Sequence, residues 1–121
     1  NHSQFAKFFI NQMTKLSTLI DNINNTQVVE QNVYKLAKCV DASYKQSYDY
    51  REINCEVKKG KKYWKLIFDN SVHAFVDVNN GDVYKPASWN KPAKHVRYNL
   101  LTNPEICLSN CDWAGGYLYI R

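Results

Sequence analysis

The chain has 121 residues, of which 45% are hydrophobic and 22% charged, and its formal net charge is +5. These values are typical of one folded domain with its own core, and they exclude a disordered chain or one that needs metals or disulfides to fold. The excess of lysine and arginine favours anionic partners, although it is far below the charge density of a histone-like protein. No stretch is long and apolar enough to span a membrane.

The first forty residues are expected to form two helices separated by a turn. Apolar side chains recur at spacings of four and three from Phe5 to Ile23, which predicts a helix over roughly Ser3 to Asn22. This spacing is typical of a helix-pairing seam, so the helix packs either against a second copy of the chain or over a sheet of its own chain. Asp21 to Thr26 has the composition of a turn. A second apolar stripe predicts a helix that ends near residue 41; its members are Val29, Val33, Leu36, Ala37 and Val40.

A β-meander is predicted for the middle of the chain. Apolar and polar residues alternate with a period of two over residues 51–57, 61–68 and 72–78, and residues 83–85 return as a fourth strand. Asn80-Gly81 predicts a type I′ hairpin turn, which requires positive φ at both positions. Phe75 stands on the polar face of the third strand, between His73 and Asp77. Its ring is therefore either covered by another element or open to stack on a ligand.

A short helix and a last strand are predicted to follow. Pro92 stands where a helix can begin, because its fixed φ suits the first turn, and Asn103-Pro104 closes a helix over residues 92–101. A loop then leads to a final strand over Tyr117 to Ile120. The sequence thus predicts a single α+β domain over residues 1–121. In it, N-terminal helices pack on an antiparallel β-meander, followed by a short helix and a C-terminal strand.

The segment from Asp82 to Leu101 carries residues that suit an anion site. At the start of the predicted helix, unpaired N–H groups and the partial positive charge of the helix end attract anions. Lys94 and Arg97 would share one face there, Lys85 ends the preceding strand, and Trp89 supplies a ring for a base. Structural interpretations stand beside this one. Trp89 would plug the gap between helix and sheet, and Arg97 would pair with a carboxylate, namely Asp77, Asp82 or Glu105.

Catalytic and metal sites are not evident in the sequence. No serine or cysteine stands in a nucleophile motif, and His73 with Asp77 on one strand face is a pair that often arises by chance. Cys107 and Cys111 would share a helix face, but the histidines lack the spacing that would complete a zinc site. We therefore expect a protein that is not an enzyme and binds no cofactor or metal. Its four cysteines are expected to be reduced thiols.

The run from Gly81 to Asn99 resembles a motif of small proteins of tailed bacteriophages. In that motif, a strand pair ending in Tyr-Lys is followed by Ala-x-Trp-x-x-Pro-Ala-Lys-His-x-Arg-Gly-Asn. Among these proteins, the chain is similar to the phage anti-Thoeris sponge family. The motif covers about a sixth of the chain. Tyr98 stands in place of its glycine, and residues 107–121 have no counterpart in it; the residues that match are Lys85, Trp89, Lys94, Arg97 and Asn99.

The resemblance implies an oligomeric, non-catalytic protein that sequesters cyclic ADP-ribose signals, and in some members cyclic oligonucleotides, in the cytoplasm of the infected bacterial host. In that role Phe75 is the candidate to stack on adenine, and the first helix offers a surface for a homodimer or higher homo-oligomer. The alternative is a small phage nucleic-acid-binding accessory protein, to which the positive charge and exposed rings are also suited. The expected ligand-binding residues are Phe75, Lys85, Trp89, Lys94, Arg97 and Asn99.

Overall fold

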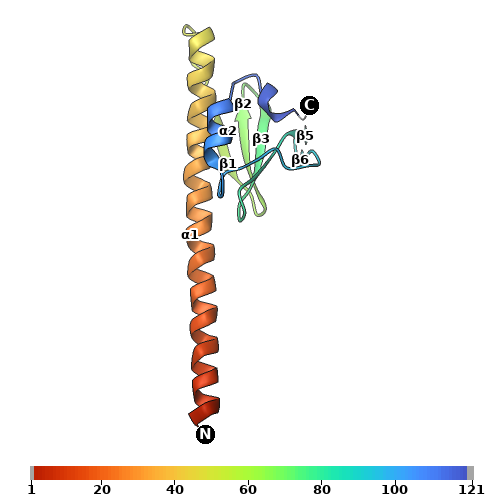
Figure 1. The fold of residues 1–121 in the computed structure, drawn as a ribbon. Helices are drawn as coiled ribbons and strands as arrows, with labels where there is room; N and C mark the ends of the chain where they lie inside the picture. Colours follow the sequence, from red (N-terminus) through yellow and green to blue (C-terminus); the bar gives the residue numbers. More distant parts are fainter. Residues whose placement is uncertain (1, 120–121) are drawn as a thin grey trace.

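The computed structural model describes residues 2–119 and confirms the α+β class. One long helix, α1 (His2–Ser47), stands beside a small antiparallel sheet, and a short helix, α2 (Pro104–Asn110), packs against α1. Figure 1 shows that only the C-terminal half of α1 lies alongside the sheet, while its N-terminal half projects away as a single rod. Along the described chain, no helix is long and apolar enough to cross a membrane.

The main sheet has five strands in the order β1-β2-β3-β4-β7, with every pair antiparallel. A separate two-stranded hairpin pairs β5 (Pro86–Ser88) with β6 (Lys91–Pro92). The predicted meander is confirmed, except that its first strand begins later than expected, because residues 51–55 lie in no strand. The strands of the main sheet are β1 (Glu56–Lys59), β2 (Tyr63–Phe68), β3 (Ser71–Asp77), β4 (Asp82–Tyr84) and β7 (Tyr98–Asn99).

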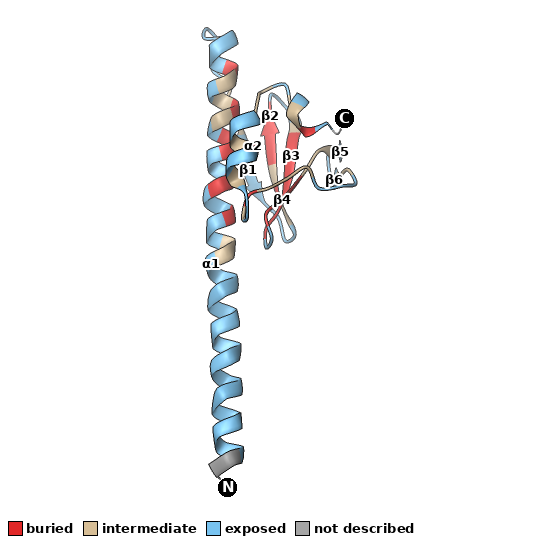
Figure 2. Ribbon diagram, in the orientation of Figure 1, coloured by how far each residue is buried: buried red, intermediate tan, exposed pale blue. Residues whose placement is uncertain are grey.

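The hydrophobic core forms between α1 and one face of the sheet. Val29, Val33 and Leu36 of α1 are fully buried there, and Figure 2 shows the buried positions of α1 only where the helix lies along the sheet. Burying an aliphatic side chain of this size contributes about 2 kcal/mol, so the contact fixes the C-terminal half of α1. The sheet residues in this core occupy the alternating positions that the sequence predicted to be apolar; they include Trp64, Leu66, Ala74, Val76 and Val83.

The predicted turn at Asp21 to Thr26 is wrong, and the two predicted helices are one. α1 continues through these residues, where the hydroxyl of Thr26 donates a hydrogen bond to the carbonyl of Ile23 (2.8 Å). Asp, Asn and Thr favour turns, but they are only weakly unfavourable inside a helix, so composition alone does not break it. The helix also runs beyond residue 41, because Tyr44 is buried against Phe68, with 5.1 Å between ring centroids.

The helix predicted over residues 92–101 does not form. Pro92 belongs to β6, Tyr98 belongs to β7, and His95 between them has a positive φ of 71°. The backbone N–H groups of this segment bond to neighbouring strands instead. That of Arg97, for example, donates to the carbonyl of Val83 (2.8 Å). These pairings satisfy the backbone without a helix, so the predicted anion site at a helix start is absent.

The short helix of the fold is α2, and Pro104 opens it rather than ending an earlier helix. Cys107 is buried on α2, whereas Cys111 follows the last residue of the helix as its C-cap with an extended backbone, so the two cysteines do not both lie in the helix that their spacing predicted. The predicted last strand is replaced by a 3-10 turn, η1 (Gly116–Leu118), which buries Leu118 in the core. Ile120 of that predicted strand lies outside the described residues.

The type I′ turn predicted at Asn80-Gly81 is also wrong. Gly81 has a positive φ of 80°, but the carboxylate of Asp77 accepts hydrogen bonds from the N–H groups of Asn79 (2.8 Å) and Asn80 (3.0 Å), which fixes a different turn. Two consecutive positive φ values occur instead at Asp69-Asn70, between β2 and β3. Gly81 remains essential to its own turn, because a Cβ there would lie 2.8 Å from the backbone nitrogen of Leu101.

Candidate functional site

The face of the sheet opposite α1 is covered by the β5–β6 hairpin. Phe75 on β3 is only 3% exposed, and its ring makes an edge contact with Tyr63, with 6.0 Å between centroids. The Nζ atom of Lys65 lies 5.8 Å from the centroid of the Phe75 ring, and β5 packs against β3. Of the two interpretations of Phe75, the structure therefore shows the covered one, and this ring is not open to a ligand.

Two hollows adjoin where the hairpin meets the C-terminal segment. They share Ser71, Val72 and Pro86 and measure about 200 Å³ and about 280 Å³. Small-molecule pockets usually measure about 300–1,000 Å³, a range that the two hollows reach only together. We call them the hairpin groove. It is lined by Phe68, Asn70, Ser71, Val72, His73, Lys85, Pro86, Ala87, Ser88, Trp89, Trp113, Ala114, Gly115, Leu118 and Tyr119.

Lysines lie against open rings at the hairpin groove. The Nζ atom of Lys85 is 4.5 Å from the ring centroid of Tyr119, and that of Lys65 is 4.7 Å from the ring centroid of Trp89. The side chain of Lys65 also donates a hydrogen bond to the amide oxygen of Asn90 (3.2 Å). Trp89 and Tyr119 remain 48% and 60% exposed. The groove thus offers cations beside flat rings, which is the chemistry that a phosphate attached to an aromatic base requires.

His73 forms a buried part of the groove wall. Its Nε2 atom lies 2.7 Å from the hydroxyl of Tyr117, and the two rings are tilted by 34°. Burial lowers the pKa of His73 to about 4, although the carboxylate of Asp112 opposes that shift. Burial, with a smaller effect of the Cys111 thiol, raises the pKa of Tyr117. Both groups are therefore uncharged near neutral pH and supply hydrogen bonds rather than charge.

Arg97 is used within the fold. Its Nε atom donates to the carbonyl of Leu118 (2.6 Å), and one terminal nitrogen donates to the carbonyls of Lys94 (2.7 Å) and His95 (2.5 Å). The guanidinium group thereby joins residues 94–97 to the C-terminal turn. Its hydrogen-bond partners are carbonyl oxygens rather than the carboxylates of Asp77, Asp82 or Glu105 that the sequence suggested.

Asn99 also has a structural role. Its Nδ2 atom donates to the carbonyl of Asn80 (2.9 Å) and the carboxylate of Asp82 (2.8 Å). Its Oδ1 atom accepts from the N–H groups of Leu101 (2.8 Å) and Thr102 (2.7 Å). All of these bonds hold the β3–β4 turn against the segment that follows β7. The amide of Asn99 therefore has little capacity left to bind a ligand.

Of the expected ligand-binding residues, Lys85 and Trp89 line the hairpin groove and Lys94 is exposed at the surface. Phe75, Arg97 and Asn99 have the structural contacts described above. Sequence reasoning missed the aromatic residues of the C-terminal segment, because no pattern in that segment links it to the hairpin. The sequence could have identified Lys65, because it occupies a polar position of the predicted second strand and pairs with Phe75 across the sheet. The missed groove aromatics are Trp113 and Tyr119.

The cysteines are free thiols, at Cys39, Cys55, Cys107 and Cys111. Burial raises the pKa of Cys55, Cys107 and Cys111 to about 12, and neighbouring carboxylate or thiol groups add to the shift in each case. Thiols with such a pKa are poor nucleophiles. Within residues 2–119, no group of three or more His, Cys, Asp or Glu side chains is placed to hold a metal ion.

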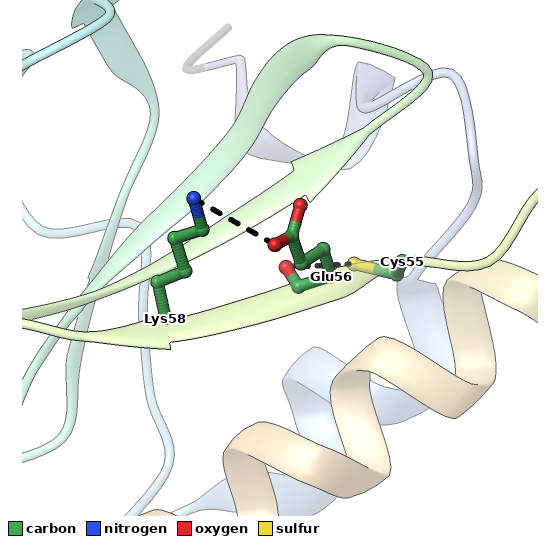
Figure 3. A network of polar contacts seen from close by, with 3 residues as sticks. All are labelled: Cys55, Glu56 and Lys58. Carbon is green, nitrogen blue, oxygen red and sulfur yellow. Dashed lines mark hydrogen bonds and ion pairs between the residues drawn. The ribbon is translucent and has the colours of Figure 1, made fainter.

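The turn between β1 and β2 concentrates positive charge. Lys58 lies 3.7 Å from the carboxylate of Glu56, and the two side chains are 61% and 59% exposed, so this ion pair contributes little stability (Figure 3). Figure 3 also shows the thiol of Cys55 beside the backbone oxygen of Glu56, at 4.0 Å. The turn is a second candidate surface, better suited to a polyanion than to a small molecule. Its exposed lysines are Lys58, Lys59, Lys61 and Lys62.

Residues 5–120 match a family of unknown function (DUF7717), so the match includes both the projecting part of α1 and the sheet. No curated protein and no solved structure matches the chain.

Proposed function

The chain belongs to DUF7717, a family of unknown function, and we propose that it is a binding protein that holds a small anionic nucleotide in the hairpin groove without cleaving it. The observation that supports this most is the placement of Lys85 and Lys65 against the open rings of Tyr119 and Trp89. Lysine ammonium groups attract phosphate, and exposed rings stack on bases. A groove that combines both on a concave surface suits a nucleotide better than an uncharged ligand.

In its specific form, the proposal is a phage anti-defence sponge that sequesters cyclic ADP-ribose-type or cyclic oligonucleotide immune signals in the cytoplasm of the infected bacterial host. The sponge would act as a homodimer or higher homo-oligomer. The Gly81 to Asn99 motif supports this form, and so does the chemistry of the groove. Two of its polar side chains are engaged in the fold: Ser71 donates to the carbonyl of Phe68 (3.1 Å), and His73 is bonded to Tyr117. Such a groove favours retention over turnover.

The test is to incubate the protein with cyclic ADP-ribose and to measure the free nucleotide before and after heat denaturation. We expect the free nucleotide to fall on mixing, with a fixed stoichiometry, and to return chemically intact on heating. A nucleotide that stays free throughout would contradict the proposal. A nucleotide that returns altered would show an enzyme instead.

Variants of the groove locate the site. Trp89→Ala and Lys85→Ala should each raise the dissociation constant at least about tenfold, which corresponds to ~1.4 kcal/mol. Lys91→Ala is the matched control, because Lys91 is an exposed lysine on the same hairpin that does not line the groove. Isothermal titration calorimetry measures the dissociation constants of all three variants. Equal weakening by Lys91→Ala would indicate general charge attraction rather than a site.

The alternative, a nucleic-acid-binding accessory protein, is favoured by one observation, the lysine-rich β1–β2 turn. Such a protein should bind any oligonucleotide of sufficient length, and its affinity should fall steeply with salt. A paired Lys59→Ala and Lys61→Ala variant should then weaken binding, whereas Trp89→Ala should have little effect. The reverse pattern, with weak salt dependence, supports the nucleotide groove.

A further inference from the structure

The N-terminal half of α1 exposes a large apolar surface. Throughout residues 4–24 every side chain is exposed, and Figure 2 shows this part of the helix without any buried position. The large apolar side chains of residues 5–28 are between 39% and 72% exposed. Monomeric proteins seldom expose a contiguous apolar patch of this extent, so such a patch marks an interaction surface. Its members are Phe5, Phe8, Phe9, Ile10, Met13, Leu16, Leu19, Ile20, Ile23 and Val28.

The central side chains of this patch follow the repeat of helices that pair with helices. Phe9, Met13, Leu16, Ile20 and Ile23 are separated by four, three, four and three residues, an average of 3.5. A helix with this repeat presents one continuous seam to a partner of the same pitch. We call these five residues the α1 seam. Phe5, Ile10 and Leu19 flank the seam and widen it.

The domain of the same chain does not cover the seam. At 3.6 residues per turn, the seam points roughly 150° around the helix axis from the side chains of Val29, Val33 and Leu36 that face the sheet. The sheet therefore lies on nearly the opposite side of α1 and further along it. A second helix can lie along the seam without touching the sheet.

The segment also lacks the composition of a helix that is stable alone in water. Residues 4–28 include four asparagines and three threonines but only one alanine. Asn and Thr are weak helix formers, and most helical stability in proteins comes from packing of an apolar face. The continuity of α1 through Asp21 to Thr26 therefore calls for a partner along this segment.

We propose that the α1 seam packs against the same seam of one or more further copies of this chain, forming a helical bundle that carries the sheet domains at its side. A half-exposed large side chain shows on the order of 100 Å². The eight side chains of the seam and its flanks thus offer roughly 800 Å² per copy, similar to the area that each partner contributes to a standard protein interface. The charged residues of the segment, Lys7, Lys15 and Asp21, all lie away from the seam, so self-pairing brings no like charges together.

A second copy fits this surface better than a membrane does. Helices that lie on membranes usually carry several cations on the polar face. The polar face here consists mainly of Asn, Thr and Ser, with only Lys7 and Lys15 as cations among residues 4–28. This inference deepens the oligomeric part of the proposed function and does not depend on which ligand the hairpin groove takes.

The test compares three full-length proteins by sedimentation equilibrium and light scattering. The wild-type chain should have a mass of two or more times the monomer mass of 14.2 kDa. A Met13→Glu and Ile20→Glu double variant, which places two carboxylates in the seam, should fall to the monomer mass. The matched control is Asn11→Glu and Thr18→Glu, with the same spacing and charge on the opposite face of the helix, and it should assemble like wild type.

Two outcomes would overturn the proposal: a wild-type chain that is monomeric up to its solubility limit, or assembly that survives the seam variant. Binding of a monomeric wild type to lipid vesicles would identify a membrane surface instead. Near-ultraviolet circular dichroism, which reports the packed aromatic side chains of the domain such as the buried Trp64, shows that each variant keeps its domain folded. Nucleotide titration of the seam variant separates the two proposals, because the hairpin groove lies in the sheet domain and should bind in the monomer.

Discussion

Arg97 holds backbone segments together, which differs from the ligand-binding role that the sequence suggested. On sequence grounds it was expected to bind a ligand, yet its guanidinium group donates to three backbone carbonyls, including that of Leu118 at 2.6 Å. Arg97→Ala should therefore lower the free energy of unfolding by about 2 kcal/mol, since hydrogen bonds from a charged donor are worth about 1.5–3 kcal/mol and one acceptor is partly buried. Urea unfolding measures this change.

Lys94→Ala is the control for Arg97, because the Lys94 side chain is exposed and has no hydrogen-bond partner among the described residues. It should change the unfolding free energy by less than about 0.5 kcal/mol. If Arg97→Ala kept the wild-type stability and lost nucleotide binding, Arg97 would be a ligand-binding residue after all. Loss of both properties would show that the loop it fixes supports the groove.

The buried His73 should make the free energy of unfolding depend on pH. Its pKa is lowered from 6.5 to about 4 in the folded protein, chiefly by burial. Between these values the unfolded chain binds a proton that the folded chain does not, so the contribution of His73 is complete above pH 6.5 and is lost as the pH falls toward 4. The free energy of unfolding should decrease by about 3 kcal/mol across this window through His73 alone. Urea unfolding at several pH values measures the decrease.

The matched variant is His73→Gln, whose side chain does not titrate in this window. It should be less stable than wild type at pH 7, and its stability should depend less on pH between 4 and 6.5. If the free energy of unfolding changed equally with pH in the two proteins, groups other than His73 would cause the loss of stability in acid. Raising the pH above 7 should not change the contribution of His73, because the imidazole is already neutral in both states.

At the scale of elements, the strands and the core face of α1 were predictable from the sequence. Period-two alternation identified β2 and β3, because side chains of a half-buried strand point alternately to core and solvent. The same pattern marked Phe75 as an exception, and the β5–β6 hairpin explains it by covering that face. Helix spacing likewise identified the buried residues Val29, Val33 and Leu36.

The elements that sequence reasoning misplaced are those decided by long-range contacts. Residues 92–101 have the proline and basic residues of a helix start, but the N–H of Ala93 bonds to the carbonyl of Lys85 (2.7 Å) and that of Leu100 to the carbonyl of Gly81 (2.8 Å). Asn32 of α1 adds a buried bond to the carbonyl of Leu100 (2.6 Å). No local pattern reports such partners. For the same reason, the candidate site lies in a groove completed by residue 119 and not at the helix start that the sequence predicted.

At the scale of the whole molecule, the fold consists of a domain with its own core and a helix that extends beyond it. Only the C-terminal half of α1 gains stability from the sheet, whereas residues 4–28 depend on other contacts for theirs. The domain and the projecting helix should therefore respond differently to dilution. Anything that binds the folded state alone stabilises it by an amount that grows with the logarithm of its concentration, and a second copy of the chain is such a partner.

Helix content should accordingly depend on protein concentration. On dilution of the wild-type chain, far-ultraviolet circular dichroism should show a loss of helix as the bundle dissociates and the exposed half of α1 unwinds, because a lone helix of this composition is unstable in water. The near-ultraviolet signal of the packed aromatic side chains, which include the buried Trp64, should stay constant, since the sheet core is intact in each copy. The Met13→Glu and Ile20→Glu variant should have the low helix content at every concentration. If the helix content of both proteins were independent of dilution, contacts within one chain would stabilise α1. That result would contradict the proposed bundle.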